Sequence, residues 1–202
     1  MLGDTCQILR LQKICVILSF RKTPRRFSAL NRIAEFEKVS FAQFKAGAEL
    51  CNVPLPADKL FEAYHGITLP RRATAGSAGY DFHSPFSFAL STRETIIIPT
   101  GIRVKIEPCW WLGILPRSGQ GFKYRIQLDN TLGVIDSDYY YADNEGHILI
   151  KLTNDSLTEK QMILDVGDSF AQGIFLPYGI TMSDEAAGKR SGGFGSTGKG
   201  GA

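Results

Sequence analysis

From about Leu69 onward, the chain is a series of short apolar runs separated by glycine, proline, asparagine and aspartate. Runs rich in β-branched and aromatic residues, with polar and apolar positions alternating, are typical of strands that bury one face. Arg103 and Lys105 alternate with apolar neighbours in this way. The regular spacing of the turn signals predicts an all-β sandwich or barrel. The clearest runs are 95–98, 102–106, 110–115, 124–128, 147–152 and 170–176.

One short helix is predicted ahead of these strands. Ser40 and Gln43 form a capping box, and apolar residues then recur at helical spacing, so we expect a helix over residues 41–50. Pro54 and Pro56 follow and are expected to end it, because proline cannot continue a helix.

The two ends of the chain depart from this pattern. An apolar run at 14–18 is followed by a basic stretch at 21–26, but the run is too short for a membrane helix and the charges are in the wrong order for a secretory signal. We interpret this end as a dispensable or wrongly assigned extension, with an organelle-targeting segment as the alternative. Residues 191–202 are too rich in glycine to build a core. We therefore expect an N-terminal extension (1–35), one β domain with its helix (36–188) and a flexible C-terminal lid (189–202).

Composition narrows the class of protein. The chain has 202 residues and a net charge of +3, which fits one soluble domain with an extension and gives no reason to expect a membrane or nucleic-acid partner. The four cysteines show no paired spacing, so neither a zinc site nor a disulfide framework is indicated, and we expect the reducing cytoplasm. The three histidines, His65, His83 and His147, lie far apart, and we expect each at the surface or half-buried.

Two segments place polar groups where a turn meets a strand. Residues 75–81 form a small-residue turn that ends in Asp81; on its own this is best explained by a carboxylate bound to local amides. Residues 116–121 bring the Arg117 guanidinium and the Ser118 hydroxyl close to the flexible backbone at Gly119. Forked guanidinium donors and backbone amides suit phosphate oxygens, although an ordinary turn with an exposed arginine fits equally well.

The third segment, 130–139, carries Asp136 and Asp138 beside Tyr139 at the end of an apolar run. In an extended chain, residues two apart share a face, so the two carboxylates would point together. Such a pair could bind a metal or raise the pKa of one partner, whereas an intervening turn would separate their roles. A polar hairpin tip without a function is the alternative.

Two further segments complete the candidate chemistry. Gln172 is an amide among apolar neighbours, placed either for a ligand or for backbone groups. The tail carries Arg190, Phe194, Ser196 and Thr197. A cation, an aromatic ring and hydroxyls on a mobile backbone are what a lid over a charged, planar-ringed ligand requires; a disordered tail with an incidental phenylalanine is the alternative.

In this order, the five segments resemble the five sequence motifs of trimeric dUTPases, over about residues 69–200. The tail 192–198 is the most specific of them, followed by 133–139. The resemblance implies a jelly-roll-like β-clip fold and a homotrimer whose active sites are shared between subunits. It also implies hydrolysis of dUTP to dUMP and pyrophosphate, which keeps uracil out of DNA and supplies dUMP for dTMP synthesis.

The resemblance also assigns roles to the middle segment. Asp136 would be the catalytic carboxylate that deprotonates the water attacking the α-phosphorus. Tyr139 would pack under the deoxyribose and exclude a 2′-hydroxyl. Asn130 would read the uracil edge together with the main chain of the hairpin at Gly133 and Ile135, and this tight hairpin would exclude a 5-methyl group.

The remaining roles follow by the same matching. Asp81 would support the site without catalysing, and Mg²⁺ would be held through the triphosphate and water, with no direct protein ligand. The phosphates would be bound by Arg117, Ser118, Gly119, Gln172 and Arg190. The uracil and the γ end of the nucleotide would be covered by Phe194, Gly195, Ser196 and Thr197.

The chain departs from the family pattern at two places. Lys189 stands where the tail arginine of the family usually lies, one residue before Arg190, and we assign the phosphate-binding role to Arg190. After Tyr139 the chain continues to Gly146 before the next strand, so we expect a longer hairpin. Two alternatives stay open: a dCTP deaminase of the same fold, and a regulatory binding protein built on the dUTPase scaffold.

Overall fold

The structure is a computed structural model, and it describes residues 31–188, 190 and 192. The expected N-terminal extension therefore lies almost entirely outside the described residues, together with its targeting alternative. So do Lys189 and four of the expected lid residues, Phe194, Gly195, Ser196 and Thr197. The elements described below belong to the unit that begins at Ile33.

Antiparallel strands are the main regular structure of this unit, with some helices beside them, which confirms the predicted class in its main feature. The described strands are β1 (Ala34–Lys38), β2 (Tyr80–His83), β3 (Phe88–Leu90), β4 (Thr95–Pro99), β5 (Ile102–Ile106), β6 (Trp110–Pro116), β7 (Ile126–Leu128), β8 (Gly133–Ile135), β9 (Leu149–Asn154), β10 (Met162–Leu164) and β11 (Ser169–Pro177). The described helices are α1 (Phe41–Leu50), α2 (Ala57–Gly66), α3 (Ser118–Tyr124) and the 3₁₀ helix η1 (Ser137–Tyr141).

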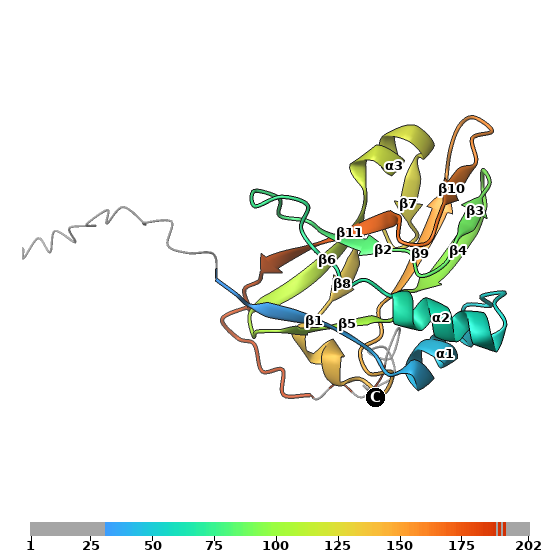
Figure 1. Cartoon of the computed structure of the whole chain (residues 1–202). Coiled ribbons are helices and arrows are strands. Elements are labelled where there is room, and N and C mark those ends of the chain that lie inside the picture. The colour runs from blue at the N-terminus through green and yellow to red at the C-terminus, as the bar shows by residue number, and fades with distance from the viewer. Residues whose placement is uncertain (1–30, 189, 191, 193–202) are drawn as a thin grey trace, which may run out of the picture. The chain divides into compact units, whose positions relative to one another are not determined.

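The strands form small sheets whose pairings are all antiparallel. A four-stranded sheet has the order β2-β11-β6-β8, and a three-stranded sheet has the order β4-β9-β7. Two-stranded pairs join β1 to β5 and β10 to β3 (Figure 1). Strands β8 and β9 follow one another in the chain but pair with different neighbours, so the segment between them connects two sheets and is not the tip of the hairpin that we expected.

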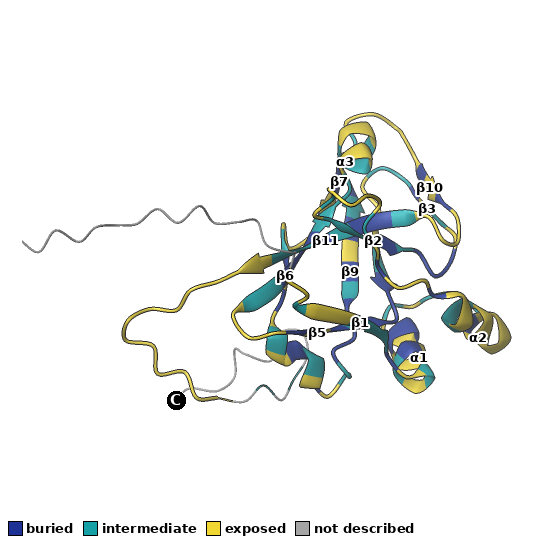
Figure 2. Ribbon diagram, turned by 60° about the vertical axis from the view of Figure 1, so that its left-hand side comes forward, coloured by how far each residue is buried: buried dark blue, intermediate teal, exposed yellow. Residues whose placement is uncertain are grey.

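The apolar positions that alternate with polar ones in the sequence are the positions that the sheets bury. In β5, Ile102, Val104 and Ile106 are buried while Lys105 is exposed. The fully buried side chains come from most of the other strands and from α1 (Figure 2). They include Phe44, Phe82, Ile98, Leu112, Ile114, Ile150, Leu152 and Phe170.

Helix α1 is confirmed, whereas α2 and α3 were not predicted. The Ser40 hydroxyl accepts a hydrogen bond from the Gln43 amide at 3.1 Å, as the capping box requires. Helix α1 ends at Leu50, ahead of both prolines, and Pro56, in an extended conformation, is instead the residue directly before α2. Helix α3 contains two glycines and buries no residue, which leaves little local signal for a helix.

Candidate active site

A mostly apolar cavity of about 180 Å³ opens between β6, β7, β8 and β9. It brings together three residues expected to read a nucleobase: Asn130, Gly133 and Ile135. An apolar cleft with a few polar groups at its edge is typical of a small-molecule site. Its walls are Ile114, Leu128, Asp129, Asn130, Gly133, Val134, Ile135, Ile148, Leu149 and Lys151.

Gly133 gives this cavity its shape. It pairs with Ile114 across β6 and β8, and a Cβ atom at this position would lie 3.0 Å from the Ile114 Cβ atom. The turn before it is tight: Thr131 has a φ of 63°, and its amide donates to the Leu128 carbonyl at 2.9 Å. Any larger residue at Gly133 must therefore displace a cavity wall.

Asp136 follows the cavity wall directly and is the N-cap residue of η1. A turn thus intervenes between Asp136 and Asp138, yet both carboxylates reach the same partner. Arg190 Nη1 lies 3.0 Å from Asp136 Oδ2 and 3.2 Å from Asp138 Oδ1. The Arg190 side chain is only 17% exposed, whereas the Asp136 side chain is 52% exposed and open to a ligand.

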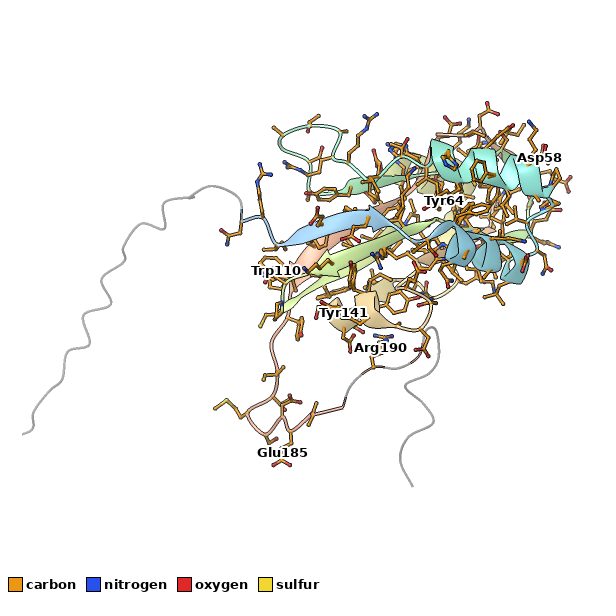
Figure 3. All side chains as sticks on the ribbon, turned by 60° about the horizontal axis from the view of Figure 1, so that its bottom comes forward. Asp58, Tyr64, Trp110, Tyr141, Glu185 and Arg190 are labelled. Atoms are coloured by element: carbon orange, nitrogen blue, oxygen red, sulfur yellow. The ribbon has the colours of Figure 1, made fainter. Side chains whose placement is uncertain are left out.

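Arg190 reaches this position from the segment that follows β11. Figure 3 shows the chain running out past Glu185 and returning, so that Arg190 lies beside η1, which carries Tyr141. Burial works to lower the pKa of Arg190, but hydrogen bonds to Asp136 and Asp138 outweigh it and hold the pKa above its ordinary value. The guanidinium is therefore a fixed positive charge beside the candidate catalytic carboxylate.

Tyr139 is buried, with 4% of its surface exposed. Its hydroxyl donates to the His147 carbonyl at 2.9 Å and accepts from Asn144 Nδ2 at 2.8 Å, while burial raises its pKa. The Arg190 Cζ atom lies 5.0 Å from the ring centroid. The ring that we expected under the sugar is thus firmly held, and a guanidinium lies over one of its faces.

The expected phosphate-binding residues other than Arg190 gather as a second group. Arg117 Nε lies 3.2 Å from Asp81 Oδ1, and Gln172 pairs in register with Asp81 across β11 and β2. Gln172 Nε2 donates to the Pro116 carbonyl at 3.0 Å, so this amide also serves the backbone. Ser118 and Gly119 are exposed at the start of α3.

The antiparallel pairing of β6 and β8 separates these two groups within one chain. Ile135, before Asp136, pairs with Leu112 near the start of β6, whereas Arg117 follows the end of β6. A strand advances about 3.3 Å per residue, so roughly 20 Å of β6 separates Asp136 from Arg117. The structure brings together the apolar cavity, Asp136, Tyr139 and Arg190, and it does not bring the Arg117 group to them.

Sequence reasoning missed a polar cavity of about 370 Å³ beside the Arg117–Asp81 pair. It is lined by Arg71, Arg72, Ala73, Asp81 and His83. Arg72 Nη1 donates to the carbonyls of Ala75 and Ser77 at 2.8 and 2.9 Å and so shapes the turn ahead of Asp81. The two consecutive arginines directly before this turn were the available signal.

The expectation for the position of His147 was wrong. We predicted a surface or half-buried histidine, but its side chain is 0% exposed and its Nε2 accepts a hydrogen bond from the Gly101 amide at 2.9 Å. Burial lowers its pKa to about 4, so the ring is neutral near pH 7. His65 is exposed and His83 is half-buried, as expected.

The sequence comparison decides the family. Residues 65–198 match the dUTPase family model. The chain belongs to the dUTPase family. The deoxyuridine 5′-triphosphate nucleotidohydrolase of Lactococcus lactis is 38% identical over 136 residues, which cover 66% of this chain and 89% of that protein. The corresponding enzyme of Haemophilus ducreyi is 40% identical over 139 residues, with 65% and 87% coverage.

A solved structure agrees with this assignment. The dUTPase of Streptococcus mutans superposes with a TM-score of 0.52 at 28% identity, covering 72% of this chain and 97% of that one. The β-sheets and helices described above are therefore those of a dUTPase-like fold. Within the part of the chain that the structure describes, no helix is long and apolar enough to cross a membrane.

Proposed function

We propose that this dUTPase-family protein hydrolyses dUTP to dUMP and pyrophosphate. The observation that carries the proposal is the position of Asp136: a half-exposed carboxylate one residue beyond the wall of a cavity sized for a nucleobase. The activity keeps uracil out of DNA and provides dUMP. A base-directed reaction such as deamination of dCTP would instead need an activated water inside the cavity, and the matched family is that of the dUTPases.

Base selection is assigned to the cavity. Asn130 is exposed at its edge, where its amide can pair with the uracil edge, and the backbone at Gly133 and Ile135 supplies the remaining polar groups. We assign the exclusion of a 5-methyl group to the tight turn at Thr131 and Gly133. Tyr139 is held through its hydroxyl, and its ring offers the sugar a rigid surface that disfavours a 2′-hydroxyl once the Arg190 guanidinium has left its face.

Asp136 is assigned to activate the water. Its carboxylate accepts a proton from the water as the oxygen attacks the α-phosphorus in line with the leaving pyrophosphate. In the free protein this carboxylate is bound by Arg190. We infer that the nucleotide's phosphates draw Arg190 away from Asp136, so that substrate binding both supplies a cation to the phosphates and frees the base.

The Arg117 group is assigned to the phosphates bound by a neighbouring copy of the chain. Since one chain holds Arg117 and Asp136 at opposite ends of β6, a homotrimer with shared sites would complete each one. Several large apolar side chains lie exposed on the monomer and are available for such contacts. They include Val134 on β8 and Leu176, Tyr178, Ile180 and Met182 at and beyond the end of β11.

We assign Mg²⁺ to the substrate, as an ion carried with its phosphates. Among the described residues, no group of three or more His, Cys, Asp or Glu side chains is placed to hold a metal, and Asp136 and Asp138 already share Arg190. A hard cation that keeps several waters would take its ligands from phosphate oxygens and water. When bound, it would offset the negative charge of the triphosphate.

The lid residues Phe194, Gly195, Ser196 and Thr197 are proposed to close over the ligand.

The test is a substrate panel. Pyrophosphate release is measured with dUTP, dTTP, dCTP and UTP, ammonia release is measured with dCTP, and the mass in solution is determined alongside. We expect turnover with dUTP alone. Ammonia from dCTP, or tight binding of dUTP with turnover no faster than that of Asp136→Asn, would replace the proposal by a deaminase or by a binding protein.

A further inference from the structure

The segment that carries Asp136 and Tyr139 is tied to a part of the chain that lies ahead of the family match. That match begins at residue 65, whereas β1 and α1 occupy residues 34–50. Three separate contacts join β1 and α1 to the stretch 137–147. None of the three involves a residue that the proposed reaction uses directly.

The first contact is a two-point hydrogen bond between Ser40 and Glu145. The Ser40 amide donates to Glu145 Oε2 at 2.7 Å, and the Ser40 hydroxyl donates to Glu145 Oε1 at 2.6 Å. The same hydroxyl accepts from Gln43 at the start of α1. Although burial works to raise the pKa of Glu145, these bonds from Ser40 lower it, so the carboxylate is charged near neutral pH.

The second contact joins β1 to η1. Glu37 Oε2 accepts hydrogen bonds from the Tyr140 hydroxyl at 2.9 Å and from Arg103 Nη2 at 2.7 Å. The Arg103 Cζ atom lies 4.5 Å from the centroid of the Tyr140 ring. Tyr140 directly follows Tyr139, so β1 holds η1 at the residue next to Tyr139, the proposed sugar platform.

The third contact is the packing of α1 on His147. A Cβ atom at Gly47 would lie 2.5 Å from His147 Cε1, so the helix backbone rests directly on the ring. The His147 carbonyl in turn accepts the hydrogen bond from Tyr139. Helix α1 therefore reaches the proposed sugar platform through a single residue.

The segment between these contacts needs outside support. A short 3₁₀ helix has poor hydrogen-bond geometry, and the chain leaves η1 through Glu145 and Gly146, both left-handed, with φ of 56° and 70°. A left-handed conformation is costly for a residue with a side chain. The two bonds from Ser40 provide a compensating interaction at the residue that carries this strain.

We propose that Glu145 is a positioning residue for the reaction: through its hydrogen bonds to Ser40, at the start of α1, it holds Asp136 and Tyr139 in their working geometry. This rests on the proposed dUTP hydrolysis. Glu145 touches neither substrate nor water in this scheme. Its effect is on where the base and the sugar platform stand when the nucleotide is bound.

The test compares Glu145→Gln with a matched control, Glu94→Gln. Glu94 Oε2 also accepts a hydrogen bond from a serine amide, that of Ser91 at 2.6 Å, but within the local turn between β3 and β4. We expect Glu145→Gln to lower kcat for dUTP about tenfold with KM nearly unchanged, as for loss of a charged hydrogen bond. Glu94→Gln should leave kcat unchanged, whatever either variant does to the unfolding midpoint.

A double variant and an activity-independent readout sharpen the test. Ser40→Ala combined with Glu145→Gln should be no slower than the worse single variant, because both remove one interaction. Amide hydrogen exchange over residues 137–146 should be faster in Glu145→Gln than in wild type or Glu94→Gln. Unchanged kcat and unchanged exchange in Glu145→Gln overturn the positioning role while wild-type turnover still supports dUTP hydrolysis. Absence of wild-type turnover overturns the hydrolysis itself, and exchange then reports on the contact alone.

Discussion

The Tyr139 hydroxyl donates a hydrogen bond to the carbonyl oxygen of His147, 2.9 Å away, and so joins the end of the Asp136 segment to the residues that lead into β9. Both residues are buried. When a buried carbonyl loses a hydrogen-bond donor, the free energy spent on removing it from water is no longer offset. This bond therefore contributes to stability as well as to the geometry of the site.

Replacing Tyr139 by Phe should lower the free energy of unfolding by about 1–3 kcal/mol, because the His147 carbonyl and Asn144 amide both lose a partner. Urea unfolding at pH 7 measures this. Tyr141→Phe is the control, since the Tyr141 side chain is 71% exposed. Equal midpoints for the two variants would show that the buried hydroxyl contributes nothing.

Replacing Asp136 by Asn should lower dUTP turnover by about 10²–10⁴-fold, the usual contribution of a positioned base. Affinity for a non-hydrolysable dUTP analogue should largely remain, since the base cavity and the Arg117 group are untouched and Arg190 keeps its bond to Asp138. Single-turnover kinetics and calorimetry separate the two. Asp138→Asn is the matched control, because it removes the other carboxylate bound to Arg190 and should cost far less turnover. A larger loss in Asp138→Asn would reverse the assignment of the base.

Acid should destabilise the fold through His147. Its pKa is about 4 in the folded chain and ordinarily 6.5, so between these values the unfolded chain binds a proton that the folded chain does not. The free energy of unfolding should therefore rise with pH from about 4 to about 6.5 and gain nothing more from this group above that. His147→Gln, whose amide oxygen can still accept from Gly101, should show a shallower dependence between pH 5 and pH 7. The same slope in both proteins would exclude His147 as the cause.

Adding a methyl group at Gly47 should destabilise the protein by about 1–3 kcal/mol, because the new Cβ meets the buried His147 ring. Gly66→Ala offers the control at the end of α2, where a Cβ meets nothing within 4 Å. That change should be neutral or stabilising by up to about 1 kcal/mol. Thermal unfolding of both variants checks the contrast, and equal effects would contradict the close packing of α1 on His147.

Shared sites predict complementation between inactive variants. Arg117→Ala and Asp136→Asn should each be nearly inactive alone. When the two are unfolded together and refolded, mixed assemblies would contain sites with an intact Arg117 from one chain and an intact Asp136 from another. Pyrophosphate release should then reappear. No recovery, although mixed assemblies are detected by mass, would mean that each chain uses its own two residues.

What was predictable from the sequence was local. Ser40 and Gln43 lie within one helical turn, so the start of α1 could be read directly, and the alternation around Arg103 and Lys105 identified β5. Asn130, Gly133 and Ile135 lie close together in the chain, and their motif was sufficient to predict that they would lie together, as they do along one cavity.

What was missed depends on distant residues. His147 is buried because Gly47 and Gly101, each more than 40 residues away, pack on it or donate to it, and no nearby residue signals this. The pairing of Arg190 with Asp136 likewise spans 54 residues. Helix α3 lacks buried positions, so it has no apolar periodicity for a sequence reading to detect.

Because β6 places Arg117 and Asp136 at its opposite ends, the activity of the protein should depend on its concentration. If the Asp136 group and the Arg117 group of each site belong to different copies, a correctly folded single chain is inactive. Activity per molecule should then fall upon dilution while circular dichroism stays constant, and the amount of chain present, beyond any change in its shape, would govern whether dUTP is cleared.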